Sequence, residues 1–226
     1  MRSFTKFLLV VLFCGVSTAV FAQTTTLAGG DVSAGNISPY INNVNPAVSN
    51  PIGSFSLVQG TSGANLTQVI FTTTGTYTTT DISAFTLYVN TNANSIIGST
   101  AVTSGSIAAS GPGTQTINLS TAYSLTTSVI TYYFFIVPTI STSAVNGHTI
   151  ATNSISSTNV SMSAGTVTGS AAASGTLTIL NHSITSTTGA SRCGTGIVTL
   201  NATPSAGASM NWYNVATGGT PSGTGT

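Results

Sequence analysis

The sequence predicts an all-β protein whose main unit is a β-sandwich. Apolar and polar side chains alternate at period two in several runs, the pattern of a strand with one buried face. Clusters of Gly, Asn and Ser separate these runs and supply the backbone conformations that turns need. Thr, Val, Ile, Tyr and Phe dominate, and these residues favour pleated, half-buried surfaces over helices. We therefore expect short strands joined by turns, with no helix beyond the first segment.

The first 22 residues have the three-part pattern of a secretory signal peptide. Two basic residues precede an apolar run over 7–16, and Val20 and Ala22 stand at the −3 and −1 positions of a cleavage site before Gln23. The apolar run is shorter than the roughly 20 residues needed to cross a bilayer. An alternative is a lipoprotein signal acylated at Cys14, although Phe13 stands where that signal needs a small residue. We expect residues 1–22 to be removed and the protein to be secreted.

Residues 23–53 are predicted to form an extended lead-in with room for one short strand. They are rich in Thr, Gly and Asn, and Pro39, Pro46 and Pro51 are spaced through them. Proline removes a backbone donor and pushes the preceding residue toward extended conformations.

Residues 54–180 are predicted to form one β-sandwich domain. Alternating apolar pairs or triplets indicate strands around 55–57, 69–71, 85–89 and 117–119. The run VITYYFFIV at 129–137 is apolar on both faces, which is typical of a central strand buried on both sides. Another strand-like run, 177–180, ends the region. About 125 residues suffice for a single sandwich domain.

Residues 181–226 resemble a known repeat. Arg192-Cys193-Gly194, the VTL run at 198–200, the NWY run at 211–213 and Gly218-Gly219 follow one another in that order. This order resembles the Ig-like repeat of giant cell-surface adhesins exported by the type IX secretion system in gliding and related Bacteroidota. The 54–180 region is similar, more loosely, to β-rich repeats of the same adhesins. The resemblance implies an Ig-like fold, a structural or adhesive role at the cell surface, and no catalytic residues.

Cys193 and Trp212 are the structural residues that this resemblance singles out. An Ig-type sandwich buries a Trp near a Cys-bearing strand and needs about seven strands. Only about three fit between 183 and 226, so residues 181–226 are interpreted as an incomplete Ig-like repeat. We expect Cys193 to be a free thiol in this chain, with a disulfide partner beyond Thr226. The alternative is a reactive thiol activated by the adjacent Arg192.

The charge content excludes two classes of partner. Charged residues make up 2% of the chain, and about a third of it is Ser plus Thr. Without residues 1–22 the formal charges are Arg192 against Asp31 and Asp81, a net charge of −1. Nucleic-acid binding and polybasic membrane binding both need clusters of Lys and Arg. We therefore expect no nucleic-acid partner and no membrane insertion after signal cleavage.

The titratable residues do not form a recognisable catalytic or metal-binding pattern. Asp81 is interpreted as a turn or edge residue, and His148 as an exposed residue beside the Asn146-Gly147 turn signal. Asp31 lies in the lead-in and His182 at the domain junction. There is no Glu and no G-x-S-x-G motif. The sequence therefore predicts a protein that is not an enzyme, with no catalytic, cofactor-binding or metal-binding residues.

These observations favour a non-enzymatic adhesin, or adhesin stalk, built of tandem β-sandwich repeats. Its expected partner is a surface polysaccharide or another extracellular surface. One alternative is a carbohydrate-binding module of a secreted polysaccharide-degrading enzyme, which would stack sugars on exposed rings such as Tyr77, Tyr88, Tyr132 or Tyr133. The other is a self-assembling surface fibre, because few charges oppose edge-to-edge pairing of strands.

Overall fold

The computed structural model describes residues 23–30, 32–39, 51–60, 63–126, 130–205, 208–215 and 219–225. The predicted signal peptide and Asp31 lie outside these residues. The all-β prediction is confirmed, since the described part consists of strands and turns with a single 3₁₀ turn at Ser157–Asn159. A helix long and apolar enough to span a membrane was sought in this part of the chain and was not found.

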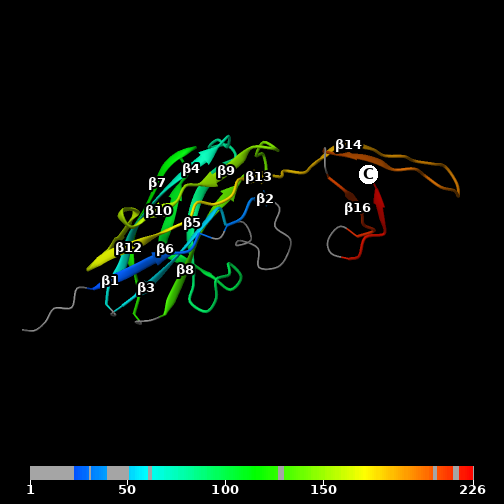
Figure 1. The fold of residues 1–226 in the computed structure, drawn as a ribbon. Coiled ribbons are helices and arrows are strands. Elements are labelled where there is room, and N and C mark those ends of the chain that lie inside the picture. Colours follow the sequence, from blue (N-terminus) through cyan, green and yellow to red (C-terminus); the bar gives the residue numbers. More distant parts are fainter. Residues whose placement is uncertain are drawn as a thin grey trace, which may run out of the picture.

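Most of the chain forms two sheets that pack face to face (Figure 1). The first sheet has seven strands, in the order β10 (Ile155–Ser156), β12 (Thr166–Ala171), β1 (Thr24–Ala28), β3 (Gly53–Gln59), β8 (Thr131–Ile140), β5 (Ile82–Asn90) and β6 (Thr100–Ala108). The second has six strands: β11 (Val160–Met162), β4 (Asn65–Gly75), β9 (Thr149–Thr152), β13 (Leu177–Ile179) and β2 (Gly35–Ile37), with β7 (Gly113–Ser124) paired to β4.

The core of the sandwich consists of the inward-facing alternate residues of both sheets. Phe55 of β3 stacks on Phe134 of β8, with ring centroids 5.0 Å apart. Phe71 of β4 meets Phe85 of β5 edge-on at 5.5 Å, and this contact joins the two sheets. All four rings are buried. The predicted alternation therefore places its apolar residues in the core.

The predicted central strand is also confirmed. β8 lies between β3 and β5, and the residues of its middle part are buried on both faces. Phe134 and Ile136 point into the core, so Phe135 and Val137 belong to the outer face because successive side chains alternate. Both are nevertheless only 5% exposed.

The lead-in contributes strands to both sheets. β1 runs parallel to β12 and antiparallel to β3, and β2 runs parallel to β13. The sandwich therefore begins with β1 and not at Ser54. After β1 the chain turns at Gly30, whose φ of +99° suits glycine, and a β-carbon there would collide with the backbone of Ala172.

Residues 183–225 form a separate pair of two-stranded sheets beyond the sandwich (Figure 1). β14 (Ile184–Thr188) pairs with β15 (Asn201–Pro204), and β16 (Met210–Trp212) pairs with β17 (Gly223–Gly225). The predicted strand at 211–213 corresponds to β16. The VTL run at 198–200, expected to be a strand, has no strand pairing, and β15 begins directly after it. Val198 and Leu200 remain exposed, so burial does not fix them in a sheet.

Candidate functional site

Asp81 and His148, 67 positions apart in the sequence, meet at one end of the sandwich. Asp81 closes the turn between β4 and β5, and His148 precedes β9. The His148 Nδ1 atom lies 2.8 Å from Oδ2 of Asp81. Asp81 is 0% exposed, whereas the side chain of His148 is 30% exposed. The interpretation of Asp81 as a turn residue is confirmed, although its side chain is fully buried. The interpretation of His148 as an exposed residue is wrong, because it is half-buried and paired with Asp81.

The Asp81 carboxylate is saturated with hydrogen-bond donors. The backbone N–H of Val145 donates to Oδ1 at 2.6 Å, and the backbone N–H and hydroxyl of Thr78 donate to Oδ2 at 2.7 and 2.8 Å. Burial raises the pKa of Asp81, but the bonds from Val145, His148 and Thr78 outweigh that effect and lower the pKa to about 2. Because an ionised carboxylate only accepts, Nδ1 of His148 carries the proton in this pair.

This arrangement is structural in character. All the donors to Asp81 come from the β4–β5 turn and the segment between β8 and β9, so the carboxylate holds these two connections together. A general base needs to reach a substrate proton, and a buried carboxylate with four donors does not. We refer to Asp81, Thr78, Val145 and His148 as the Asp81 clamp.

The prediction of exposed, sugar-stacking rings is wrong for two of the four tyrosines. Tyr77 is 1% exposed, and its hydroxyl donates to the carbonyl of Gly111 at 2.6 Å. Tyr132 is 4% exposed and points into the core. Tyr88 of β5 and Tyr133 of β8 are half-buried, on the outer face of the seven-stranded sheet. Because the run at 129–137 is apolar on both faces, its pattern did not predict which of Tyr132 and Tyr133 points outward.

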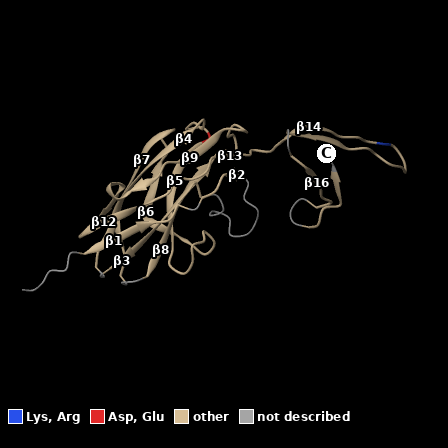
Figure 2. Ribbon diagram, viewed as in Figure 1, with Lys and Arg blue, Asp and Glu red and all other residues tan. Residues whose placement is uncertain are grey.

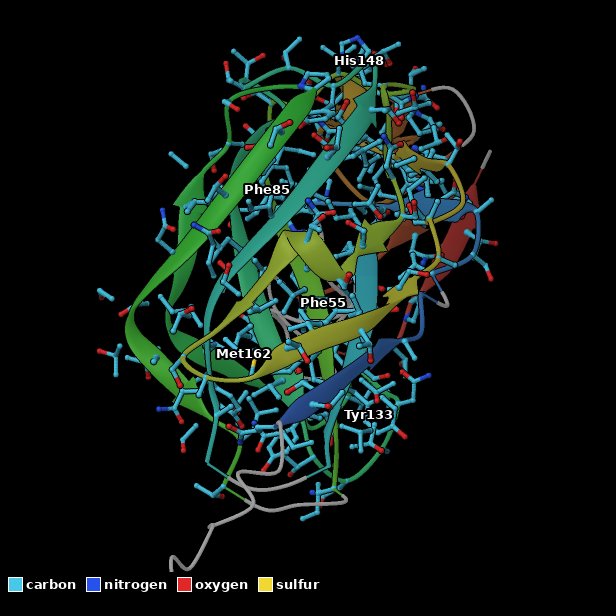
Figure 3. The ribbon with its side chains drawn as sticks, turned by 60° about the vertical axis from the view of Figure 1, so that its left-hand side comes forward. Phe55, Phe85, Tyr133, His148 and Met162 are labelled. Atoms are coloured by element: carbon cyan, nitrogen blue, oxygen red, sulfur yellow. The ribbon has the colours of Figure 1, made fainter. Side chains whose placement is uncertain are left out.

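Two adjoining hollows, which we call the outer groove, lie on this face. The larger measures about 430 Å³ and the smaller about 180 Å³, and both are lined by Ser54 and Asn94. The floor is formed by Ser54 and Ser56 of β3 and by Tyr133 and Phe135 of β8. Figure 3 shows Tyr133 at the end of the sandwich opposite His148, and no residue of the Asp81 clamp lines either hollow, so the groove and the clamp are separate features.

One wall of the outer groove is residues 94–96, in the loop between β5 and β6. The buried side chain of Asn90 organises this loop. Its amide donates to the carbonyls of Ser95 at 2.8 Å and Ile97 at 3.1 Å. Its oxygen accepts the backbone N–H groups of Asn92 at 2.9 Å and Ala93 at 3.2 Å. The loop is therefore held in one shape by a fully used buried amide.

The other wall is formed by the stretches 29–30 and 32–37. The backbone fixes it at several points: the N–H of Gly175 donates to the carbonyl of Val32 at 2.8 Å, and the N–H of Leu180 donates to that of Ile37 at 2.7 Å. Both walls are thus built by hydrogen bonds within the fold. The sequence did not predict this site, because its described lining comes from five separate parts of the chain: 29–30 with 32–37, 51–56, 94–96, 133–135 and Leu177.

The remaining predicted residues are found in the outer unit and at its junction. Cys193 is a free, exposed thiol, and Trp212 of β16 is half-buried. His182 lies between β13 and β14. Within the described residues, no group of three or more His, Cys, Asp or Glu side chains could hold a metal ion.

The chain was also compared with known proteins. No protein-family model matches it, and a search of curated proteins returned no match. Its function is therefore argued from the fold, the surface and the outer groove.

Proposed function

We propose that the chain is a non-enzymatic, secreted cell-surface adhesin module, or part of an adhesin stalk, built of tandem β-sandwich units. The observation that supports this most strongly is the chemistry of the surface. Among the described residues of the sandwich, Asp81 is the one formally charged side chain, and it is buried. In Figure 2 the described acidic and basic positions are confined to one place in the sandwich and one in the outer unit.

Such a surface suits contact with hydrated, neutral material. Its exposed polar groups are mainly hydroxyls and amides. Such groups can replace a hydrogen bond to water by one to a sugar hydroxyl with little change in free energy. It offers no basic patch to an anionic polymer. The unit formed by β14–β17 follows the sandwich in the chain, which supports an arrangement of units in series (Figure 1).

The second candidate is a carbohydrate-binding module of a secreted polysaccharide-degrading enzyme, and the outer groove is the observation that favours it. An adhesin and such a module can share the same ligand, so they differ in what they are attached to. Any coding sequence that follows residue 226 separates them: further sandwich repeats favour the adhesin, and a catalytic domain favours the module.

Retention on surfaces tests the proposal. Beads coated with the purified chain should be held on polysaccharide films under flow, in contrast to beads coated with albumin. Because the described sandwich surface has no exposed formal charge, retention should be the same at low salt and at about 1 M salt. Antibody labelling of intact cells that produce the full chain tests its exposure at the cell surface. Absence of labelling, or retention that salt abolishes, would contradict the proposal.

A further inference from the structure

The floor of the outer groove combines aromatic and hydroxyl groups. Tyr133 is half-buried and Phe135 forms the base, while Ser54 and Ser56 stand opposite them on β3 in register. The larger hollow, about 430 Å³, falls within the usual size range of ligand pockets. An aromatic face beside a few fixed polar groups is the usual make-up of a site that orients a small ligand.

The groove is already shaped for binding. Asn90 fixes the wall at 94–96 with four hydrogen bonds, and backbone bonds from Gly175 and Leu180 fix the wall at 32–37. A preformed site loses little conformational entropy when a ligand enters. Amide and hydroxyl side chains of Asn36, Asn94 and Ser95 line the rim.

The chemistry of the lining narrows the class of ligand. None of the described residues that line the two hollows is charged, so these residues supply no counter-ion to an anionic group that enters. A purely apolar ligand would cover the exposed amide of Asn36 from water and offer it no hydrogen bond. A neutral sugar suits both the polar rim and the aromatic floor. Its hydroxyls can form hydrogen bonds with amides while its C–H face lies on an aromatic ring.

A peptide fits the groove less well than a sugar. Peptides bind sheets mainly by adding a strand to a free edge. The floor strands β3 and β8 are interior strands, since β3 is paired with β1 and β8, and β8 with β3 and β5. Their backbone groups are already used in the sheet, so side chains alone must hold a ligand.

We infer that the outer groove, with Tyr133 and Phe135 as its floor and Asn94 on its rim, binds a segment of a neutral polysaccharide. The inference rests on the proposed function and deepens it, because it assigns the ligand class and the place where the ligand binds. It concerns the sandwich itself and does not require the unit formed by β14–β17.

Binding of soluble polysaccharides to the purified chain tests this inference. Laminarin, galactomannan, xyloglucan and dextran serve as neutral probes, and alginate and chondroitin sulfate as anionic ones, in affinity electrophoresis followed by calorimetry. At least one neutral probe should bind, and no anionic probe should bind more tightly. Tyr133→Ala and Asn94→Ala should each weaken that binding at least tenfold. Asn94 is exposed, so its variant should keep the fold even where Tyr133→Ala does not.

Two matched variants serve as controls. Tyr88→Ala removes another half-buried tyrosine from the neighbouring strand, which is paired with Phe135 but lines neither hollow. Asn118→Ala removes an exposed amide from β7 in the other sheet. Each should change affinity less than twofold.

The inference is overturned if no neutral probe binds, if anionic probes bind preferentially, or if Tyr88→Ala weakens binding as much as Tyr133→Ala. It is also overturned if neither groove variant changes the affinity. These outcomes are independent of cell-surface exposure: binding in solution with no labelling of intact cells would overturn the proposed function and leave the groove assignment standing.

Discussion

Replacement of Asp81 by asparagine is expected to destabilise the protein and to remove most of its acid sensitivity. Asp81 is 0% exposed and accepts hydrogen bonds from Val145, His148 and, twice, from Thr78. Asparagine keeps one acceptor oxygen and turns an NH₂ group toward these donors. Leaving buried donors unsatisfied costs about 1–3 kcal/mol. We expect the free energy of unfolding at neutral pH to fall by that amount.

The pH dependence follows from the lowered pKa of Asp81. Its pKa is about 2 in the folded protein, against an ordinary value of 3.8, so folding favours the ionised form. This contribution is fully present above the unfolded pKa and is lost as pH falls from about 5 toward 2. At 1.36 kcal/mol per pKa unit it amounts to about 2 kcal/mol. For a chain of this size that corresponds to a fall in Tm of about 4–8 °C.

Urea unfolding at a series of pH values between 6 and 2 measures this effect. The chain has only two acidic side chains, Asp31 and Asp81, so the comparison is simple. The wild type and the Asp31→Asn variant should both lose about 2 kcal/mol across this range, while Asp81→Asn should lose much less. If Asp81→Asn keeps the full pH dependence, or Asp31→Asn abolishes it, the account of the clamp is wrong.

Two further predictions concern the core and the outer unit. Phe85→Ala removes a ring that contacts both Phe71 and Tyr77 between the sheets, and should lower the free energy of unfolding in urea by about 3–5 kcal/mol; a loss below about 1 kcal/mol would mean that the two sheets do not pack through it. Cys193 is exposed, so the native protein should react with a thiol reagent as completely as the urea-unfolded protein, and Cys193→Ser should abolish that reaction at this site; protection in the native state would contradict its exposure.

Hydrophobic alternation predicted the strands that build the core. The runs at 55–57, 69–71 and 85–89 fall within β3, β4 and β5, and their apolar residues are buried. Strands such as β1, with the sequence TTTLA, and β6, with TAVTSGSIA, carry few apolar residues and lack that signal. Pairing with neighbouring strands forms them, and pairing is a tertiary effect that local sequence does not encode.

The candidate sites were harder to predict because they are assembled from distant segments. No motif or spacing in the sequence predicts a contact between Asp81 and His148, since each stands in or beside a turn whose composition is typical of turns. For the outer groove, the sequence pattern indicated both Tyr132 and Tyr133 as candidate sugar-stacking residues and did not distinguish between them. The register of β8 decides between them, and the pairing of Ser56 with Tyr133 is what turns the latter outward.

The Asp81 clamp and Tyr133 on the floor of the outer groove lie at opposite ends of the sandwich, yet both depend on the same two strands, β5 and β8. The clamp holds the start of β5 beside the end of β8, where the N–H of Ser141 also donates to the carbonyl of Asp81 at 2.8 Å. After one register shift between Ile82 and Ala84, the antiparallel pairing of the two strands continues to Asn90, which lies opposite Tyr133. A slip of one residue would turn Tyr133 and Phe135 inward and displace Asn90 from its loop. A buried charge is costly to retain in so neutral a chain. The Asp81 carboxylate fixes the pairing of β5 with β8, and these strands carry one wall and part of the floor of the groove. This gives a physical reason for keeping the buried charge.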